Sequence, residues 1–150
     1  MGHFPVNHPL RPAYRTLAAF IGLYALVFGI VGVTQSHDTP LFAQTRLPWV
    51  LGLRTNLAFA SLSIATGAIL IAAAVIGRNV DAVANTTAGT AFITVGLLAL
   101  CVMQTNANYL GFSMVNCNVS FILGTLLLTA GFYGKSAPPE PSPAPLRPTG

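Results

Sequence analysis

Few residues of the types that carry out chemistry occur in this 150-residue chain, and those few are scattered. The three histidines, His3, His8 and His37, do not have the spacing of metal ligands. His37 and Asp38 are neighbours, but no Gly-x-Ser-x-Gly turn supplies a nucleophile for them. We therefore predict no metal site, no cofactor and no enzymatic activity.

Two cysteines and a group of amides lie near one another in the sequence. Cys101 and Cys117 are each expected about one helical turn from a helix end on the same side of the molecule, so they could face each other. The pair could form a disulfide, or each thiol could pack as a small apolar group. The amides could cap helices and link them, or could line a ligand pocket. They are Gln104, Asn106, Asn108, Asn116 and Asn118.

The segments that must position these side chains are four long apolar stretches. Residues 16–34, 57–77, 82–103 and 113–133 contain no Asp, Glu, Lys or Arg. Each has about 20 residues, which as a helix spans the hydrocarbon layer of a bilayer. The sequence therefore predicts an all-α integral membrane four-helix bundle over residues 16–134. Ser113 lies three residues before Asn116, and this spacing resembles a capping box at the start of the fourth helix.

Composition and charge agree with a membrane protein. Hydrophobic residues make up 53% of the chain and charged residues 7%, with a mean hydropathy of +0.68. The net charge is +4, but the basic residues are dispersed and form no stripe, so we predict no nucleic-acid partner. Five basic residues would lie on one side of a four-span chain: Arg11, Arg15, Arg78, Lys135 and Arg147. Only Arg46 and Arg54 lie on the other side, which predicts cytoplasmic termini in a cell membrane.

The connecting segments carry further expectations. In the long connection 35–56, residues 48–53 are apolar enough to form a short interfacial helical turn. Residues 78–81 form a tight turn between helices two and three, which we expect to pair as a hairpin. Asp81 should cap helix three, and Arg78 should face the negative end of helix two. Arg54, at a positive helix end, should need a negative partner.

The two ends of the chain differ from the bundle. Residues 1–15 form a cytoplasmic segment containing three prolines. Residues 135–150 are rich in proline and cannot build a packed core, so they should form a disordered tail.

A weak internal repeat relates the two halves of the chain. Leu51-Gly52 precedes helix two as Leu110-Gly111 precedes helix four, and Ser61 and Thr66 recur as Ser120 and Thr125. Gly22 and Gly29 likewise correspond to Gly89 and Gly96. A duplicated hairpin would make the halves parallel repeats, as in some transporters, although small residues are common in any membrane helix.

Several short motifs give the chain a family resemblance. They are Leu-Gly-Leu-Arg-Thr-Asn at 51–56, Val-Ile-Gly-Arg-Asn-Val-Asp at 75–81, Gln-Thr-Asn-Ala-Asn at 104–108 and Ser-Met-Val-Asn at 113–116. On these motifs, residues 8–134 resemble a family of small four-helix actinobacterial membrane proteins, catalogued as a domain of unknown function. The resemblance implies the four-span fold, but no activity. It marks as motif positions, with a structural or interaction role, Arg54, Asn56, Arg78, Asn79, Asp81, Asn106 and Asn116.

Three functions fit these observations. We expect a non-catalytic structural or accessory subunit of a membrane assembly, with the bilayer and a membrane protein or a second copy as partners. The alternative is an oligomeric transporter or channel for ions or small solutes, whose outer mouth the amides would line. An enzyme acting on lipid head groups would have to use His37, Asp38 and Arg54.

Overall fold

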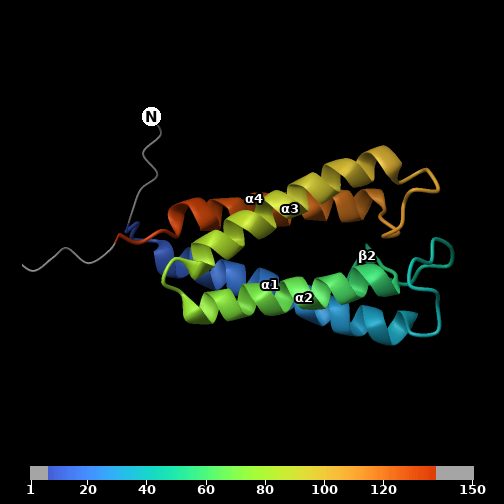
Figure 1. Ribbon diagram of the computed structural model, residues 1–150, viewed down its shortest axis with the longest axis horizontal. Helices are drawn as coiled ribbons and strands as arrows, with labels where there is room; N and C mark the ends of the chain where they lie inside the picture. Colours follow the sequence, from blue (N-terminus) through green and yellow to red (C-terminus); the bar gives the residue numbers. More distant parts are fainter. Residues whose placement is uncertain (1–6, 138–150) are drawn as a thin grey trace, which may run out of the picture.

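The computed structural model describes residues 7–137. The other residues of the expected N-terminal segment and of the expected C-terminal tail lie outside this range. The elements are α1 (Arg11–Ser36), β1 (Trp49–Val50), β2 (Leu53–Arg54), α2 (Leu57–Ile76), α3 (Val80–Val102) and α4 (Met114–Tyr133) (Figure 1). All four helices are long and apolar enough to cross a membrane. The predicted all-helical four-span architecture is therefore confirmed at the level of helix number, length and composition.

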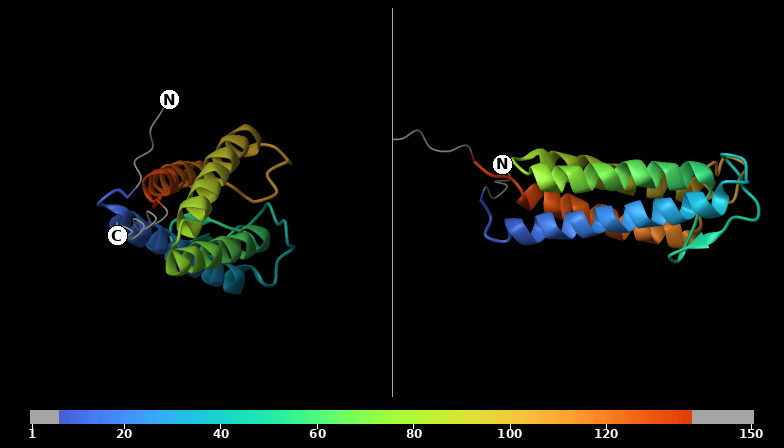
Figure 2. Two further views of the ribbon diagram at one scale, coloured as in Figure 1. Left: turned by 60° about the vertical axis from the view of Figure 1, so that its left-hand side comes forward. Right: turned by 90° about the horizontal axis from the view of Figure 1, so that it is seen from below.

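The helices run up and down the long axis as two close pairs (Figures 1 and 2). α1 packs along α2 and α3 packs along α4, whereas the α2–α3 and α1–α4 contacts are much less extensive. Helices two and three run antiparallel, as expected of a hairpin, but they are not a closely packed pair (Figure 1). The chain makes a tight turn between them, but each helix packs mainly on its other neighbour. We call the end of the bundle that holds this turn the inner end, and the end that holds the 37–56 connection the outer end.

Glycines explain the pairing because they let backbones approach each other. A Cβ atom at Gly67 of α2 would lie 2.6 Å from the carbonyl oxygen of Gly22 in α1. A Cβ atom at Gly124 of α4 would lie 2.9 Å from the carbonyl oxygen of Gly89 in α3. Close backbone contact of this kind is how helices associate in lipid, where burial of apolar surface gives little driving force.

The buried positions repeat between the two pairs. Gly22 and Gly29 are buried in α1 as Gly89 and Gly96 are in α3. α2 and α4 also match when their residue numbers are offset by 57. Their N-caps are then Asn56 and Ser113, and the matching buried residues are Ser63 and Ser120, Gly67 and Gly124, and Leu70 and Leu127. The sequence comparison paired Ser61 with Ser120. In the structure Ser61 is exposed, and the buried counterpart of Ser120 is Ser63, two residues later.

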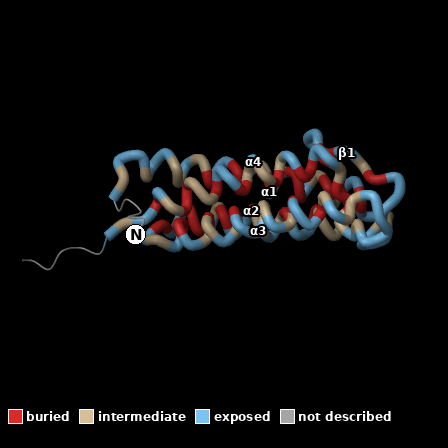
Figure 3. Tube along the Cα trace, turned by 90° about the horizontal axis from the view of Figure 1, so that it is seen from above, coloured by how far each residue is buried: buried red, intermediate tan, exposed pale blue. Residues whose placement is uncertain are grey.

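Buried residues line the interior along the whole length of the bundle, and exposed residues cover the outside (Figure 3). One core cluster near the inner half includes Ile21, Leu70 and Leu127 from three helices. A second cluster near the outer end contains Phe28, Val50 and Leu53. The core is therefore shared by both helix pairs.

The 48–53 segment is a β-hairpin and not the predicted helical turn. β1 and β2 pair antiparallel, with Val50 opposite Leu53. The two turn residues, Leu51 and Gly52, have φ angles of 46° and 85°. Two consecutive positive φ angles are typical of a two-residue hairpin turn and incompatible with a right-handed helix. The hairpin buries Val50 and Leu53 and leaves Trp49 exposed.

The glycine contacts give a direct test of the helix pairing. Gly67→Val should lower stability by about 1–3 kcal/mol because the new side chain must displace the backbone of α1. Ala68→Val is the matched control, since Ala68 is exposed on the same helix. Thermal unfolding in detergent measures both variants, and equal stability of the two would contradict the assigned interface.

Candidate functional site

Asn116 links α4 to the β-hairpin at the outer end. Its Nδ2 donates to the carbonyl oxygen of Arg54 at 2.7 Å, and its Oδ1 accepts from the amide of Arg54 at 3.1 Å. Its Oδ1 also accepts from the hydroxyl of Ser113 at 2.7 Å, and Ser113 is the N-cap of α4, as the capping pattern predicted. Asn116 is 1% exposed. Its side chain thus completes the edge of β2 in the manner of a third strand.

Asn56 and Asn108 hold the remaining outer segments. Asn56 caps α2, with its Oδ1 accepting from the amide of Phe59 at 2.9 Å. Its Nδ2 donates to the carbonyl oxygens of Ala43 and Tyr109, which belong to two different connections. Asn108 bonds to backbone groups of its own loop at both ends. We call Asn56, Asn108 and Asn116 the outer amide cluster, and its side-chain groups are bonded mainly to backbone.

At the inner end, two arginines of α1 reach the ends of the other helices. Arg15 donates to the carbonyl oxygens of Ala74 and Val75 at the C-terminus of α2. Arg11 donates to the carbonyl oxygen of Gly134 after α4 at 2.8 Å. A cation at a helix C-terminus satisfies free carbonyls and opposes the negative end of the helix dipole. The first turn of α1 therefore fixes the ends of both α2 and α4.

Asp81 completes this inner arginine cluster of Arg11, Arg15 and Asp81. Its Oδ1 lies 3.8 Å from a guanidinium nitrogen of Arg11, is buried and has no hydrogen-bond partner in the structure. Asp81 was expected to cap helix three, but it lies inside the first turn of α3. It acts there as the counter-charge to Arg11, because burial of a lone carboxylate would be costly.

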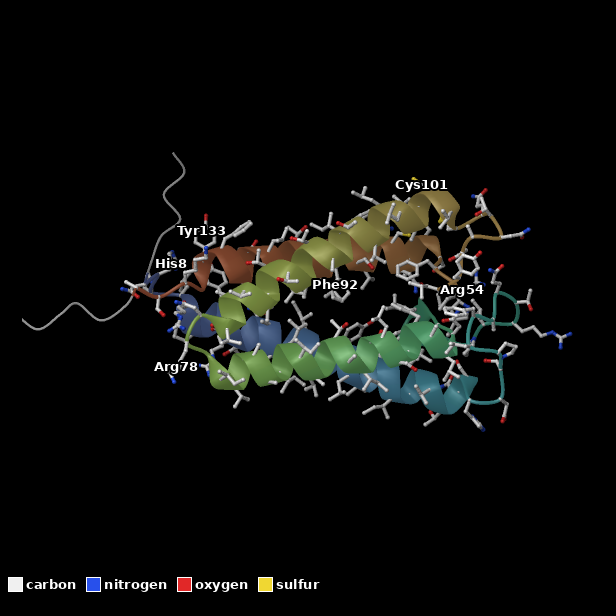
Figure 4. The ribbon with its side chains drawn as sticks, viewed as in Figure 1. His8, Arg54, Arg78, Phe92, Cys101 and Tyr133 are labelled. Atoms are coloured by element: carbon white, nitrogen blue, oxygen red, sulfur yellow. The ribbon has the colours of Figure 1, made fainter. Side chains whose placement is uncertain are left out.

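Asn79 and Arg78, adjacent in the α2–α3 turn, have different environments. The amide of Asn79 exchanges two hydrogen bonds with the backbone of Ser136, at 2.7 and 3.0 Å, and holds the chain that leaves α4. Arg78 is exposed at the same end of the bundle as His8 and Tyr133 (Figure 4). Arg78 directly follows the C-cap of α2, Gly77, but the side chain that donates to the last carbonyl oxygens of α2 is that of Arg15.

The remaining motif residues, Arg54 and Asn106, contribute backbone groups. Arg54 lies at the outer end and pairs with Asn116 through its peptide group (Figure 4). Asn106 accepts from the side chain of Gln44 through its carbonyl oxygen. Among residues 7–137 the two ion pairs are Arg11–Asp81 and His37–Asp38, so the negative partner expected for Arg54 is not found there.

The cysteines and the histidine–aspartate pair lie in separate environments. Cys101 and Cys117 are free thiols, with Cys101 exposed and Cys117 buried against Ala99 and Phe112. His37 and Asp38 form an exposed pair at 3.0 Å. Within the described part of the chain, no three His, Cys, Asp or Glu side chains come close enough to hold a metal ion.

Comparison with protein-family models, with curated proteins and with solved structures finds no match to this chain. The resemblance inferred from the four motifs therefore remains an expectation. The structure adds a physical reason for several of these motifs, since Asn56, Asn79, Asp81 and Asn116 each join segments that are distant in sequence.

Asn116→Ala should destabilise the outer end. The substitution leaves the peptide amide and carbonyl of Arg54 unpaired, at a cost of about 1–3 kcal/mol. Asn106→Ala is the matched control, because Asn106 bonds through its backbone. Arg54→Ala should also be mild. Unfolding in mixed detergent micelles measures all three, and a loss in Asn106→Ala equal to that in Asn116→Ala would refute the role of the amide.

Arg15→Gln should weaken the inner end by about 1 kcal/mol or more, since hydrogen bonds from a charged donor are among the stronger ones. Arg78→Gln is the matched control, because it removes the same charge from the same end and the Arg78 side chain has no hydrogen bond or ion pair among residues 7–137. Hydrogen exchange of the last turn of α2 should increase in Arg15→Gln only. Unchanged protection of that turn would show that Arg15 does not hold it.

Proposed function

We propose that this protein is a multi-pass integral membrane protein without a catalytic role, which serves as a structural or accessory subunit of a membrane assembly. The observation that carries the proposal is the distribution of polar and apolar groups. The side chains of Asn56, Asn79 and Asn116 are bonded to backbone groups at the two ends, and large apolar side chains cover the outside between the ends.

Each of the four helices exposes large apolar side chains. They include Phe20, Leu23 and Ile30 of α1, Ile69 and Val75 of α2, Val83, Leu97 and Leu98 of α3, and Ile122 of α4. Such a continuous apolar exterior exceeds what soluble monomers expose, and it suits contact with lipid or with other membrane helices.

Aromatic residues gather at both ends of this apolar zone. The rings of His8, Tyr14 and Tyr133 contact one another in tilted and edge-to-face arrangements at the inner end, with ring centroids 5.5 to 5.9 Å apart. Trp49 and Tyr109 are exposed at the outer end. Amphipathic rings at both ends are typical of proteins that cross a bilayer, where the rings lie at head-group depth.

The orientation follows from charge. Arg11, Arg15, Arg78 and Lys135 lie at the inner end, and Arg46 and Arg54 lie at the outer end. An excess of basic residues marks the cytoplasmic side, so we place the inner end and both termini in the cytoplasm of a bacterial cell.

A transporter or channel is a weaker candidate. In that hypothesis the amides between residues 104 and 118 would line a mouth. Two of them, Asn108 and Asn116, are bonded to backbone groups, whereas Gln104, Asn106 and Asn118 are exposed. The internal repeat is the observation in its favour, because duplicated hairpins occur in transporters.

The assembly proposal is tested by purification from the native membrane in a mild detergent, with photo-crosslinkers at exposed positions Phe20, Ile69, Leu98 and Ile122. We expect one helix face to crosslink to a single partner protein that co-purifies in fixed stoichiometry. A homo-oligomer that conducts ions or solutes in liposomes would contradict the proposal and support the alternative.

A further inference from the structure

A groove of about 400 Å³ lies between α2 and α3, where the two helix pairs meet. Its walls include Leu62, Thr66 and Ile69 of α2, and Ala88 and Phe92 of α3. Phe92 extends from α3 into the space between the two helices (Figure 4). The groove exists because the glycine contacts lie within the pairs α1–α2 and α3–α4, while α2 and α3 diverge from their tight turn toward the outer end (Figure 1).

The groove offers little to a polar ligand. Four hydroxyl side chains line it. Those of Ser63 and Thr66 donate to the carbonyl oxygens of Phe59 and Leu62 in their own helix, at 2.8 and 2.9 Å, whereas those of Thr87 and Ser120 make no hydrogen bond within residues 7–137. The other lining side chains are mostly aliphatic or aromatic. A bound water needs two to four polar partners, so a hydrocarbon occupant fits this lining better than water does.

A cation lies where the groove reaches the inner end. A second hollow, lined by Arg78, Asn79, Val80, Val83 and Ala84, shares Ala84 with the groove. Arg78 is exposed there, and no ion pair or hydrogen bond to its side chain occurs among residues 7–137. The nearby carboxylate of Asp81 is buried and faces Arg11. Among residues 7–137, therefore, no side chain neutralises the positive charge at this hollow.

We propose that the groove binds one anionic glycerophospholipid, with an acyl chain between α2 and α3 and its phosphate at Arg78. Basic sites between membrane helices at the cytoplasmic side are suited to anionic head groups. A flexible acyl chain can follow a groove whose walls converge on a turn at one end (Figure 1). The proposal needs the bilayer location proposed above, but it does not need a protein partner.

Tryptophan fluorescence quenching by brominated lipids tests the site directly. Trp49 is the single tryptophan of the chain, so Trp49→Phe gives a silent background. Phe92→Trp then reports on the groove. Leu98→Trp reports on bulk lipid, because Leu98 is exposed on the same helix and does not line the groove. The protein is reconstituted in phosphatidylcholine with increasing brominated phosphatidylglycerol, or with brominated phosphatidylcholine as the neutral probe.

In Phe92→Trp, we expect the anionic lipid to quench the tryptophan fluorescence at a mole fraction about fivefold lower than the neutral lipid requires. A preference of this size corresponds to the attraction of an anionic lipid by one basic residue near the membrane surface. Arg78→Gln should remove this preference, Arg78→Lys should keep it, and Arg46→Gln at the other end should leave it unchanged. In Leu98→Trp, both lipids should quench alike.

Equal quenching by both lipids at position 92, an unchanged preference in Arg78→Gln, or no quenching at position 92 would each overturn the proposal. The last outcome would indicate that protein fills the groove. Absence of quenching at position 98 as well would instead contradict the bilayer location. If Phe92→Trp does not fold, Leu62→Trp on the opposite wall carries the same measurement.

Discussion

Close contact between helix backbones is the constraint on which the rest of this structure depends. In lipid, apolar side chains gain little by leaving their surroundings, so helices associate where small residues let their backbones meet. Gly22 with Gly67, and Gly89 with Gly124, provide two such contacts. They divide the molecule into two tight pairs, and the looser junction between the pairs is where the α2–α3 groove lies.

Polar side chains join the two pairs at the ends, where the glycine contacts do not act. Asn116 on α4 holds the strand before α2, and Arg11 on α1 binds the end of α4 and faces Asp81 on α3. These contacts satisfy backbone groups that helix ends leave free. The side chains of Asn56, Asn79, Asp81 and Asn116 are thus explained by assembly of the fold, whereas Arg78 is an exposed cation.

The sequence predicted the helices well because long uncharged runs have one stable form in a bilayer. The faces through which the helices meet were not predicted. Ala68 and Ala72 show the same four-residue spacing as Ser63 and Gly67, yet Ala68 and Ala72 are exposed, so spacing alone does not identify an interface. The first helix was predicted to begin at residue 16, because prolines precede it. In the structure α1 begins at Arg11, since Pro12 lies in the first turn, where proline is tolerated.

The roles of the polar residues depend on contacts between distant segments, which sequence patterns do not reveal. Arg15 reaches carbonyls 59 and 60 residues away, and the only local signal was a basic residue near the first helix. The hairpin at 49–54 was missed because its apolar composition also fits a helix, and Leu51 adopts a positive φ that its residue type does not favour. The cap at Ser113 was found because it depends on spacing within four residues.

The placement of the two ends of the bundle on opposite sides of a membrane is tested most directly by labelling single cysteines with a membrane-impermeant maleimide in intact cells. The background is Cys101→Ser with Cys117→Ala, and the test positions are Arg46→Cys at the outer end and Arg78→Cys at the inner end. We predict labelling at position 46 in intact cells and at position 78 only after permeabilisation. Labelling of both positions in intact cells, or recovery of the protein in the soluble fraction, would contradict the four-span membrane fold.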